Sequence, residues 1–143
     1  MNIKPLVKDF IKPEYKRDLS GGMDIYFQED VELTVGKDNV INLGFCAEVP
    51  EGHVALLVPR SSTGMKGLHL RNTVGVIDAD YRGEWIAHIT YDDNNVWGNT
   101  IKFKRGERAL QALIIPVKQE SINIVDELSI TGRGDGGFGS TGK

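Results

Sequence analysis

The sequence lacks the features that mark several large protein classes. It contains a single cysteine, Cys46, which excludes an internal disulfide and a multi-cysteine metal site. No apolar run approaches the roughly 18 residues of a membrane span, and the N-terminal ten residues lack the apolar centre of a signal peptide. The net charge of −3 provides no basic excess for coating a nucleic acid. We therefore expect a cytoplasmic protein that binds neither membranes nor nucleic acid directly.

The remaining composition is that of an ordinary globular domain. The 143 residues fit one domain with one core, and the 40% hydrophobic and 26% charged residues exclude a disordered or membrane class. A small anionic ligand remains compatible with the net charge, because a few local cationic groups can hold it. Cys46 lies in the apolar stretch 43–49, which predicts a buried and unreactive thiol.

Short runs rich in β-branched and aromatic residues predict strands throughout the chain. Clusters of Gly, Asn, Asp and Ser between these runs are typical of turns. The only helical candidate is a short turn at 61–66. This pattern predicts an all-β, jelly-roll-like sandwich or barrel. The expected strands are 23–27, 31–35, 53–58, 73–77, 84–91, 100–103, 108–117 and 121–125.

The glycine-rich C-terminus differs from everything before it. We expect a β domain at residues 1–132 and a flexible C-terminal arm at residues 133–143. The arm ends in the spacing G-x-x-x-x-G-K of a P-loop, but no Ser/Thr or helix follows to hold a phosphate, so a P-loop is rejected. Glycine backbone N–H groups, the Arg133 guanidinium and the Phe138 ring would still suit a nucleotide. A merely disordered tail is the alternative.

Two segments upstream carry residues suited to phosphate and water chemistry. Arg60, Ser61 and Ser62 follow an apolar strand and provide donors for phosphate oxygens, although a capped turn explains them as well. The hairpin 72–84 presents Asp78, which is able to deprotonate a water, and Tyr81, whose ring offers a flat wall to a sugar. A turn-capping role for Asp78 is the alternative.

Gln111 is a third candidate, because it stands inside an otherwise apolar strand. A side-chain amide in such a position needs a hydrogen-bond partner to offset its burial.

Taken together, five segments resemble the ordered motifs of the trimeric dUTPase family. They occur in the family's order and extend from near the start of the chain to its end, and 13–15 also resembles the family's N-terminal segment. Gly21 departs from the alanine that is usual there. The five segments are 20–24, 60–62, 75–84, 108–111 and 133–142.

The resemblance also implies an assembly and a reaction. It implies a homotrimer whose active sites are each assembled from three subunits and which hydrolyses dUTP to dUMP and pyrophosphate, keeping uracil out of DNA and supplying dUMP for dTMP synthesis. Asp78 would activate the water that attacks the α-phosphorus. Asp24 would hold Mg²⁺ through the water shell of the ion, in keeping with this metal's preference for few carboxylates plus substrate phosphates.

The resemblance also implies a role for each substrate-binding residue. Phosphates would be bound by Arg60, Ser61, Ser62 and Gln111, with Arg133 reaching the γ-phosphate. Uracil would be read by Asn72 and by backbone groups at Val76 and Ile77, and Tyr81 would pack against the deoxyribose. The arm would close through Phe138, stacked on the base, and Gly139, Ser140 and Thr141.

Two alternatives compete with this interpretation. A dCTP deaminase shares the fold and needs a proton-shuttling glutamate on the strand after the 75–78 turn; His88 stands where that glutamate is expected, and Glu84 fits the pyrophosphatase motif. A non-catalytic protein that uses the nucleotide site as a switch is the other. The presence of Asp78 and Asp24 argues for catalysis but leaves an added regulatory role open.

Overall fold

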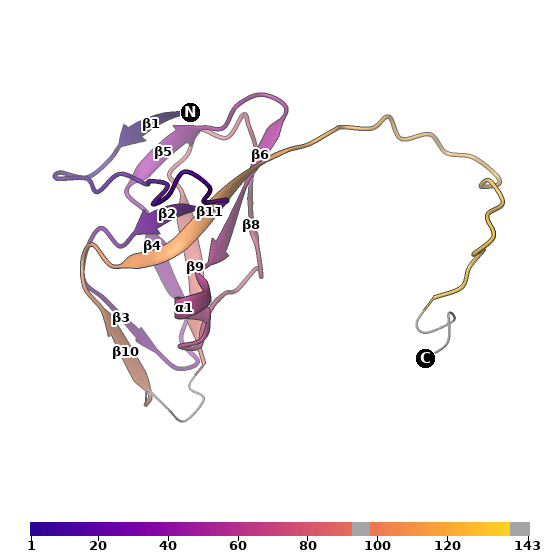
Figure 1. Cartoon of the computed structure of the whole chain (residues 1–143). Coiled ribbons are helices and arrows are strands. Elements are labelled where there is room, and N and C mark those ends of the chain that lie inside the picture. Colours follow the sequence, from indigo (N-terminus) through magenta and orange to yellow (C-terminus); the bar gives the residue numbers. More distant parts are fainter. Residues whose placement is uncertain (93–97, 138–143) are drawn as a thin grey trace.

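The computed structural model describes residues 1–92 and 98–137 and is built almost wholly of short antiparallel strands (Figure 1). The described elements are β1 (Asn2–Pro5), β2 (Met23–Tyr26), β3 (Val31–Thr34), β4 (Asn39–Asn42), β5 (Phe45–Glu48), β6 (His53–Pro59), α1 (Ser61–Gly64), β7 (Leu68–Leu70), β8 (Gly75–Ile77), β9 (Ile86–Tyr91), β10 (Thr100–Phe103) and β11 (Arg108–Pro116).

The strands form two larger sheets and two pairs. The four-stranded sheet has the order β2-β11-β6-β8 and the three-stranded sheet the order β4-β9-β7, while β1 pairs with β5 and β10 with β3. This all-β, jelly-roll-like architecture confirms the predicted fold class. In the part of the chain that the structure describes, no helix is long and apolar enough to cross a membrane.

The core lies between the sheets and is set by alternation along each strand. In β3, Val31 and Leu33 are buried while Glu32 is exposed, and β9 alternates in the same way, as a strand with one face on the core requires. Aromatic rings fill the centre, with Phe45 and Trp85 centroids 5.0 Å apart. Burying a large apolar side chain stabilises the fold by about 1.5–3 kcal/mol.

Four short strands were not predicted from the sequence, namely β1, β4, β5 and β7. Two other predictions were wrong. Cys46 is partly exposed rather than buried, because β5 pairs only with the short β1 and so lies at an edge. The predicted strand at 121–125 is absent: these residues lie outside the sheets, and an isolated extended segment has no ladder of hydrogen bonds to stabilise it.

Beyond β11 the chain leaves the body of the protein. The connecting segment, residues 117–132, runs away from the sheets toward the arm (Figure 1). It carries large apolar side chains that contact little within one chain. Their exposed fractions are 92% for Ile122, 100% for Ile124, 86% for Leu128 and 101% for Ile130. Exposed apolar groups in such number are typical of a surface that contacts another molecule.

Candidate functional site

Three neighbouring strands bring a buried carboxylate and two guanidinium groups together. Asp24 on β2 is the register partner of Gln111 on β11, and Arg60 follows the last residue of β6, which pairs with β11 in turn. Arg60 Nε lies 2.7 Å from Asp24 Oδ1, and Arg108 Nη1 lies 3.2 Å from Asp24 Oδ2. Asp24 is only 7% exposed, so both of its oxygens are charge-paired, as a buried carboxylate needs.

The short helix α1 presents the two predicted serines beside this cluster. Arg60 donates from Nη1 to Ser62 Oγ at 3.2 Å, and Thr63 Oγ1 donates to the Arg60 carbonyl at 2.9 Å, which fixes the turn. Ser61 and Ser62 are exposed. Their hydroxyl groups therefore remain available to a ligand next to the Arg60 guanidinium.

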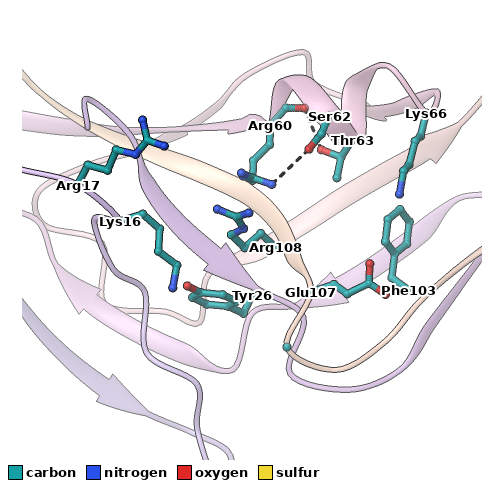
Figure 2. A pocket seen from close by; sticks show the side chains of 11 residues that line it. Lys16, Arg17, Tyr26, Arg60, Ser62, Thr63, Lys66, Phe103, Glu107 and Arg108 are labelled. Atoms are coloured by element: carbon teal, nitrogen blue, oxygen red, sulfur yellow. Dashed lines mark hydrogen bonds between the residues drawn. The ribbon is translucent and has the colours of Figure 1, made fainter. Parts of the chain in front are cut away.

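These residues border two adjoining cavities of about 390 and 680 Å³, which we call together the cationic cavity. Arg60 and Arg108 face it from the sheet, and the N-terminal loop adds Lys16 and Arg17 (Figure 2). Lys66 lines its far side. A concave surface with this many positive groups favours a multiply charged anion such as a polyphosphate.

Lys16 is held in the wall of the cationic cavity by a small polar network. Tyr26 Oη donates to Glu14 Oε1 at 2.6 Å, and the Lys16 ammonium pairs with the same carboxylate. Hydrogen bonds from Lys16 and Tyr26 lower the pKa of Glu14. The Glu14 partner raises the pKa of Lys16, and burial, followed by the Glu14 hydrogen bond, raises that of Tyr26. Lys16 thus stays cationic at the cavity.

Gln111 also lines the cationic cavity, and its side-chain amide has a hydrogen-bond partner, as the sequence predicted. Its Nε2 donates weakly to the Pro59 carbonyl at 3.5 Å. A Cβ on Gly22 would lie only 2.6 Å from Gln111 Oε1, so the glycine of the first motif makes room for this amide.

Lys16, Arg17 and Arg108 were not predicted from the sequence as members of the site. Lys16 and Arg17 form an isolated basic pair before the 20–22 turn, which is a weak signal. Arg108 opens the strand that carries Gln111, but only the strand order places it against Asp24.

The residues of the predicted hairpin, 72–84, surround a second, separate cavity of about 340 Å³, which we call the hairpin cavity. The paired hairpin itself was a wrong prediction, because β8 pairs with β6 while β9 lies in the other sheet between β4 and β7. The lining of the hairpin cavity includes Asn72, Val76, Ile77, Asp78 and Tyr81, so the structure brings all five predicted hairpin residues together. Asp78 is exposed, and its carbonyl accepts from the Tyr81 backbone N–H at 3.2 Å, which closes the turn between β8 and β9. The walls are more apolar than those of the cationic cavity, as a base and a sugar require.

Within one chain the two cavities stand apart and share no lining residue. β8 runs antiparallel to β6, with Ile77 opposite Ala55 and Gly75 opposite Leu57. Asp78 therefore lies beside the start of β6, whereas Arg60 follows its end. Six residues of strand at about 3.3 Å each separate them by about 20 Å. One chain therefore does not bring Asp78 close to Arg60.

The described part of the arm, residues 133–137, lies away from the sheets in this single chain (Figure 1). Arg133 is exposed and donates from Nε to the Gly136 carbonyl at 2.7 Å. The four remaining predicted site residues lie outside the described residues; they are Phe138, Gly139, Ser140 and Thr141.

Comparison with known proteins identifies the family of the chain. Residues 8–142 match the model of the dUTPase family. The chain belongs to the dUTPase family. A deoxyuridine 5'-triphosphate nucleotidohydrolase of Nautilia profundicola is 39% identical over 144 residues, covering 100% of this chain and 99% of the relative. That of Ehrlichia canis is 42% identical, covering 91% and 86%.

Solved dUTPase structures share the whole fold. Two structures of the dUTPase of Staphylococcus bacteriophage 80alpha with dUpNHpp have TM-scores of 0.88 and 0.87 at 28% identity. Each alignment covers 99% of this chain and 98% of the phage chain. Membership of the dUTPase family decides against the dCTP deaminase interpretation, in agreement with His88 at the position where that enzyme needs a glutamate.

Proposed function

We propose that this dUTPase-family protein hydrolyses dUTP of the cytoplasmic nucleotide pool to dUMP and pyrophosphate. The observation that carries the proposal is the pairing of a nucleoside-sized hairpin cavity, with Asp78 on its rim, and a cationic cavity suited to a triphosphate. The names of the relatives support this substrate, as does the dUTP analogue in the phage structures.

In the proposed reaction, Asp78 accepts a proton from a water as its oxygen attacks the α-phosphorus. The bond between the α-phosphorus and the bridging oxygen to the β-phosphate breaks, and pyrophosphate leaves with that oxygen. Arg60, Ser61 and Ser62 bind the phosphate oxygens and align the chain, with Gln111 beside them. A positioned base contributes roughly 10²–10⁴ in rate, and fixed donors around the phosphates supply much of the rest.

Base recognition is assigned to the free edge of β8. This strand ends the order β2-β11-β6-β8, so its outer edge pairs with no strand within residues 1–92 and 98–137. Successive residues of β8 point their N–H and C=O groups alternately toward and away from β6, so one of Val76 and Ile77 presents free backbone groups to the uracil edge, with the Asn72 amide beside them. A site built for these hydrogen bonds rejects a base that lacks them by about 10⁴ or more. Tyr81 packs against the deoxyribose and excludes a 2′-hydroxyl.

The donor set of the cationic cavity fits Mg²⁺ bound with the substrate rather than alone. No cluster of three or more His, Cys, Asp or Glu side chains exists in the described part of the chain, so the phosphates must supply most ligands, as is common for this ion. Asp24 would hold the ion through its water shell. When bound, the ion neutralises charge that develops on the triphosphate.

We propose a homotrimer with shared active sites. The separation of about 20 Å along β6 requires Asp78 of one copy to meet Arg60 of another. The exposed apolar side chains of the connecting segment provide a surface for contact between copies. The arm of a further copy would then deliver Arg133 to the γ-phosphate and Phe138, Gly139, Ser140 and Thr141 to the base, closing when the triphosphate is present.

A pyrophosphate-release assay with dUTP, dCTP, dTTP and UTP in the presence of Mg²⁺ tests the proposed reaction. We expect rapid release from dUTP alone. Untouched dUTP, or comparable release from dCTP, contradicts the proposal.

Nucleotide-dependent regulation is the second candidate function. It is favoured by one observation, the similarity to the 80alpha protein, a phage dUTPase described as controlling the transfer of virulence genes. Capture of partners from a host extract with and without dUpNHpp tests it. A partner retained only with the nucleotide supports a switch, and identical captures in both conditions contradict it.

A further inference from the structure

The Tyr81 side chain folds back across Gly83 in the turn between β8 and β9. A Cβ on Gly83 would lie 2.3 Å from Tyr81 Oη, 2.5 Å from Cζ and 3.0 Å from Cε2. Atoms never approach a Cβ so closely, so the ring occupies the space that any side chain at position 83 would need. Gly83 has no left-handed φ. Glycine is therefore required at position 83 because the Tyr81 ring leaves no room for a side chain, and not because of the backbone conformation.

The tip of the ring is held by a hydrogen bond to the backbone. Tyr81 Oη donates to the Glu84 carbonyl at 3.0 Å. Glu84 is itself anchored, because its Oε1 accepts from the Gly44 N–H at 3.1 Å, and the next residue, Trp85, donates from its backbone to the Phe45 carbonyl at 2.9 Å. Tyr81 is 44% exposed, yet its ring is held at the backbone by its own Cα and at its tip by the hydrogen bond to the Glu84 carbonyl.

We propose that Gly83 is a positioning residue that sets the sugar specificity of the site. The absent side chain lets the Tyr81 phenol reach the Glu84 carbonyl, which holds the ring as a fixed wall of the hairpin cavity. The inference rests on the proposed function, in which this ring excludes a 2′-hydroxyl. The new element is that the Tyr81 ring excludes the 2′-hydroxyl only while position 83 is glycine.

The Gly83→Ala variant separates this role from a role in folding. The clash falls on the far end of a half-exposed side chain, which can rotate away, and the backbone at position 83 is accessible to alanine. The domain should fold normally while the ring loses its place. We expect the ratio of kcat/KM for dUTP to kcat/KM for UTP to fall by about tenfold or more, the size of effect that a small change in pocket shape gives.

Two further variants sharpen the test. Gly64→Ala is the matched control, because a Cβ there meets nothing within 4 Å, and it should leave the ratio unchanged. Tyr81→Phe keeps the ring but removes the hydrogen bond to Glu84, and it should lower the ratio by a smaller factor. An unchanged ratio in Gly83→Ala with a normal Tm overturns the proposal; if that variant does not fold, an unchanged ratio in Tyr81→Phe does so.

A crystal structure of Gly83→Ala provides a readout that does not depend on activity. A displaced Tyr81 ring supports the steric role, and a ring still bonded to the Glu84 carbonyl overturns it. Failure of the wild-type protein to hydrolyse dUTP would instead contradict the proposed function, so the two failures are distinguishable.

Discussion

Asp24 is clamped by Arg60, whose Nε lies 2.7 Å from its Oδ1. With Arg108 at 3.2 Å from the other oxygen, the carboxylate has no uncompensated charge although it is buried. A metal ion that approaches Asp24 alone therefore meets two competing cations and the further positive charge of Lys16 and Arg17. In the proposed function, a triphosphate would offer the guanidinium groups another partner, and this would link the binding of a metal ion at Asp24 to the binding of the nucleotide.

Arg108→Gln should weaken this clamp from one side. We expect KM for dUTP to rise by about tenfold, the effect of losing one charge-assisted contact, and stability to fall by about 1 kcal/mol. The loss is below that of a fully buried pair because Arg108 is 42% exposed and Arg60 still compensates the carboxylate.

Steady-state kinetics and urea unfolding measure the two effects of Arg108→Gln. Lys102→Gln is the control, since it breaks only the exposed pair with Glu32 at 3.1 Å. Equal KM values for Arg108→Gln and the wild type would remove Arg108 from the phosphate site.

Asp78→Asn should abolish the base while leaving the shape of the hairpin cavity unchanged. We expect kcat to fall by about 10²-fold or more, with the Kd for dUpNHpp within a few-fold of wild type. Single-turnover kinetics and calorimetric titration separate the two quantities. Asp80→Asn, an exposed neighbour that does not line the cavity, should keep its rate. Turnover comparable to wild type in Asp78→Asn would exclude Asp78 as the base.

The sequence was sufficient for most of the strand pattern and for the hairpin residues, because both are local. Alternating apolar residues define a strand such as β3, and Asn72 to Tyr81 line one cavity because they belong to one short segment of the chain. Contacts across the sheet were harder to predict from the sequence. Arg108 and Asp24 are 84 positions apart, and only the order β2-β11-β6 makes them neighbours.

The errors have the same origin. An apolar stretch around Cys46 does not reveal that its strand ends at the edge of a two-stranded pair. The alternation at 121–125 is a real strand signal, but a strand needs a neighbouring strand to pair with, and within residues 1–92 and 98–137 none pairs with this segment. The distance between Asp78 and Arg60 could not be predicted either, because it depends on the register of β6 and β8, which the motifs do not contain.

Truncation after Gly132 should remove the lid without removing the assembly. Loss of residues 133–143 deletes Arg133 and the glycine-rich segment, and we expect turnover of dUTP to fall by about 10²-fold or more because water is no longer excluded from the phosphates. Sedimentation should still show the mass of the intact oligomer. A monomeric truncated protein would make the arm part of the architecture instead.

Acid stability should depend on Glu14. The pKa of this carboxyl is lower in the folded protein than its ordinary value of 4.5, so the unfolded chain binds more protons as the pH falls toward and below that value. The stabilising contribution is complete above the ordinary pKa and is lost as the pH falls through the folded pKa.

Glu14→Gln should therefore reduce the fall of Tm between about pH 6 and pH 3. Differential scanning calorimetry across this range measures it. Glu32→Gln, at an exposed ion pair, is the control. A Tm that falls as steeply in Glu14→Gln as in the wild type would show that the network around Tyr26 does not govern acid unfolding.

Mixing inactive subunits gives the sharpest test of a shared active site. If each site takes Asp78 from one copy and Arg60 from another, Asp78→Asn and Arg60→Gln proteins are each inactive, but mixed trimers contain some sites with both residues intact. Random assembly from equal amounts should restore about a quarter of wild-type activity, since each site needs two independent choices of subunit. Asp78→Asn mixed with Asn72→Ala is the control, because both changes fall in the same hairpin cavity and no gain over the separate proteins is expected. Mixed trimers, verified by mass, that stay as inactive as their parents would place the whole site in one chain and exclude the sharing inferred from the register of β6 and β8.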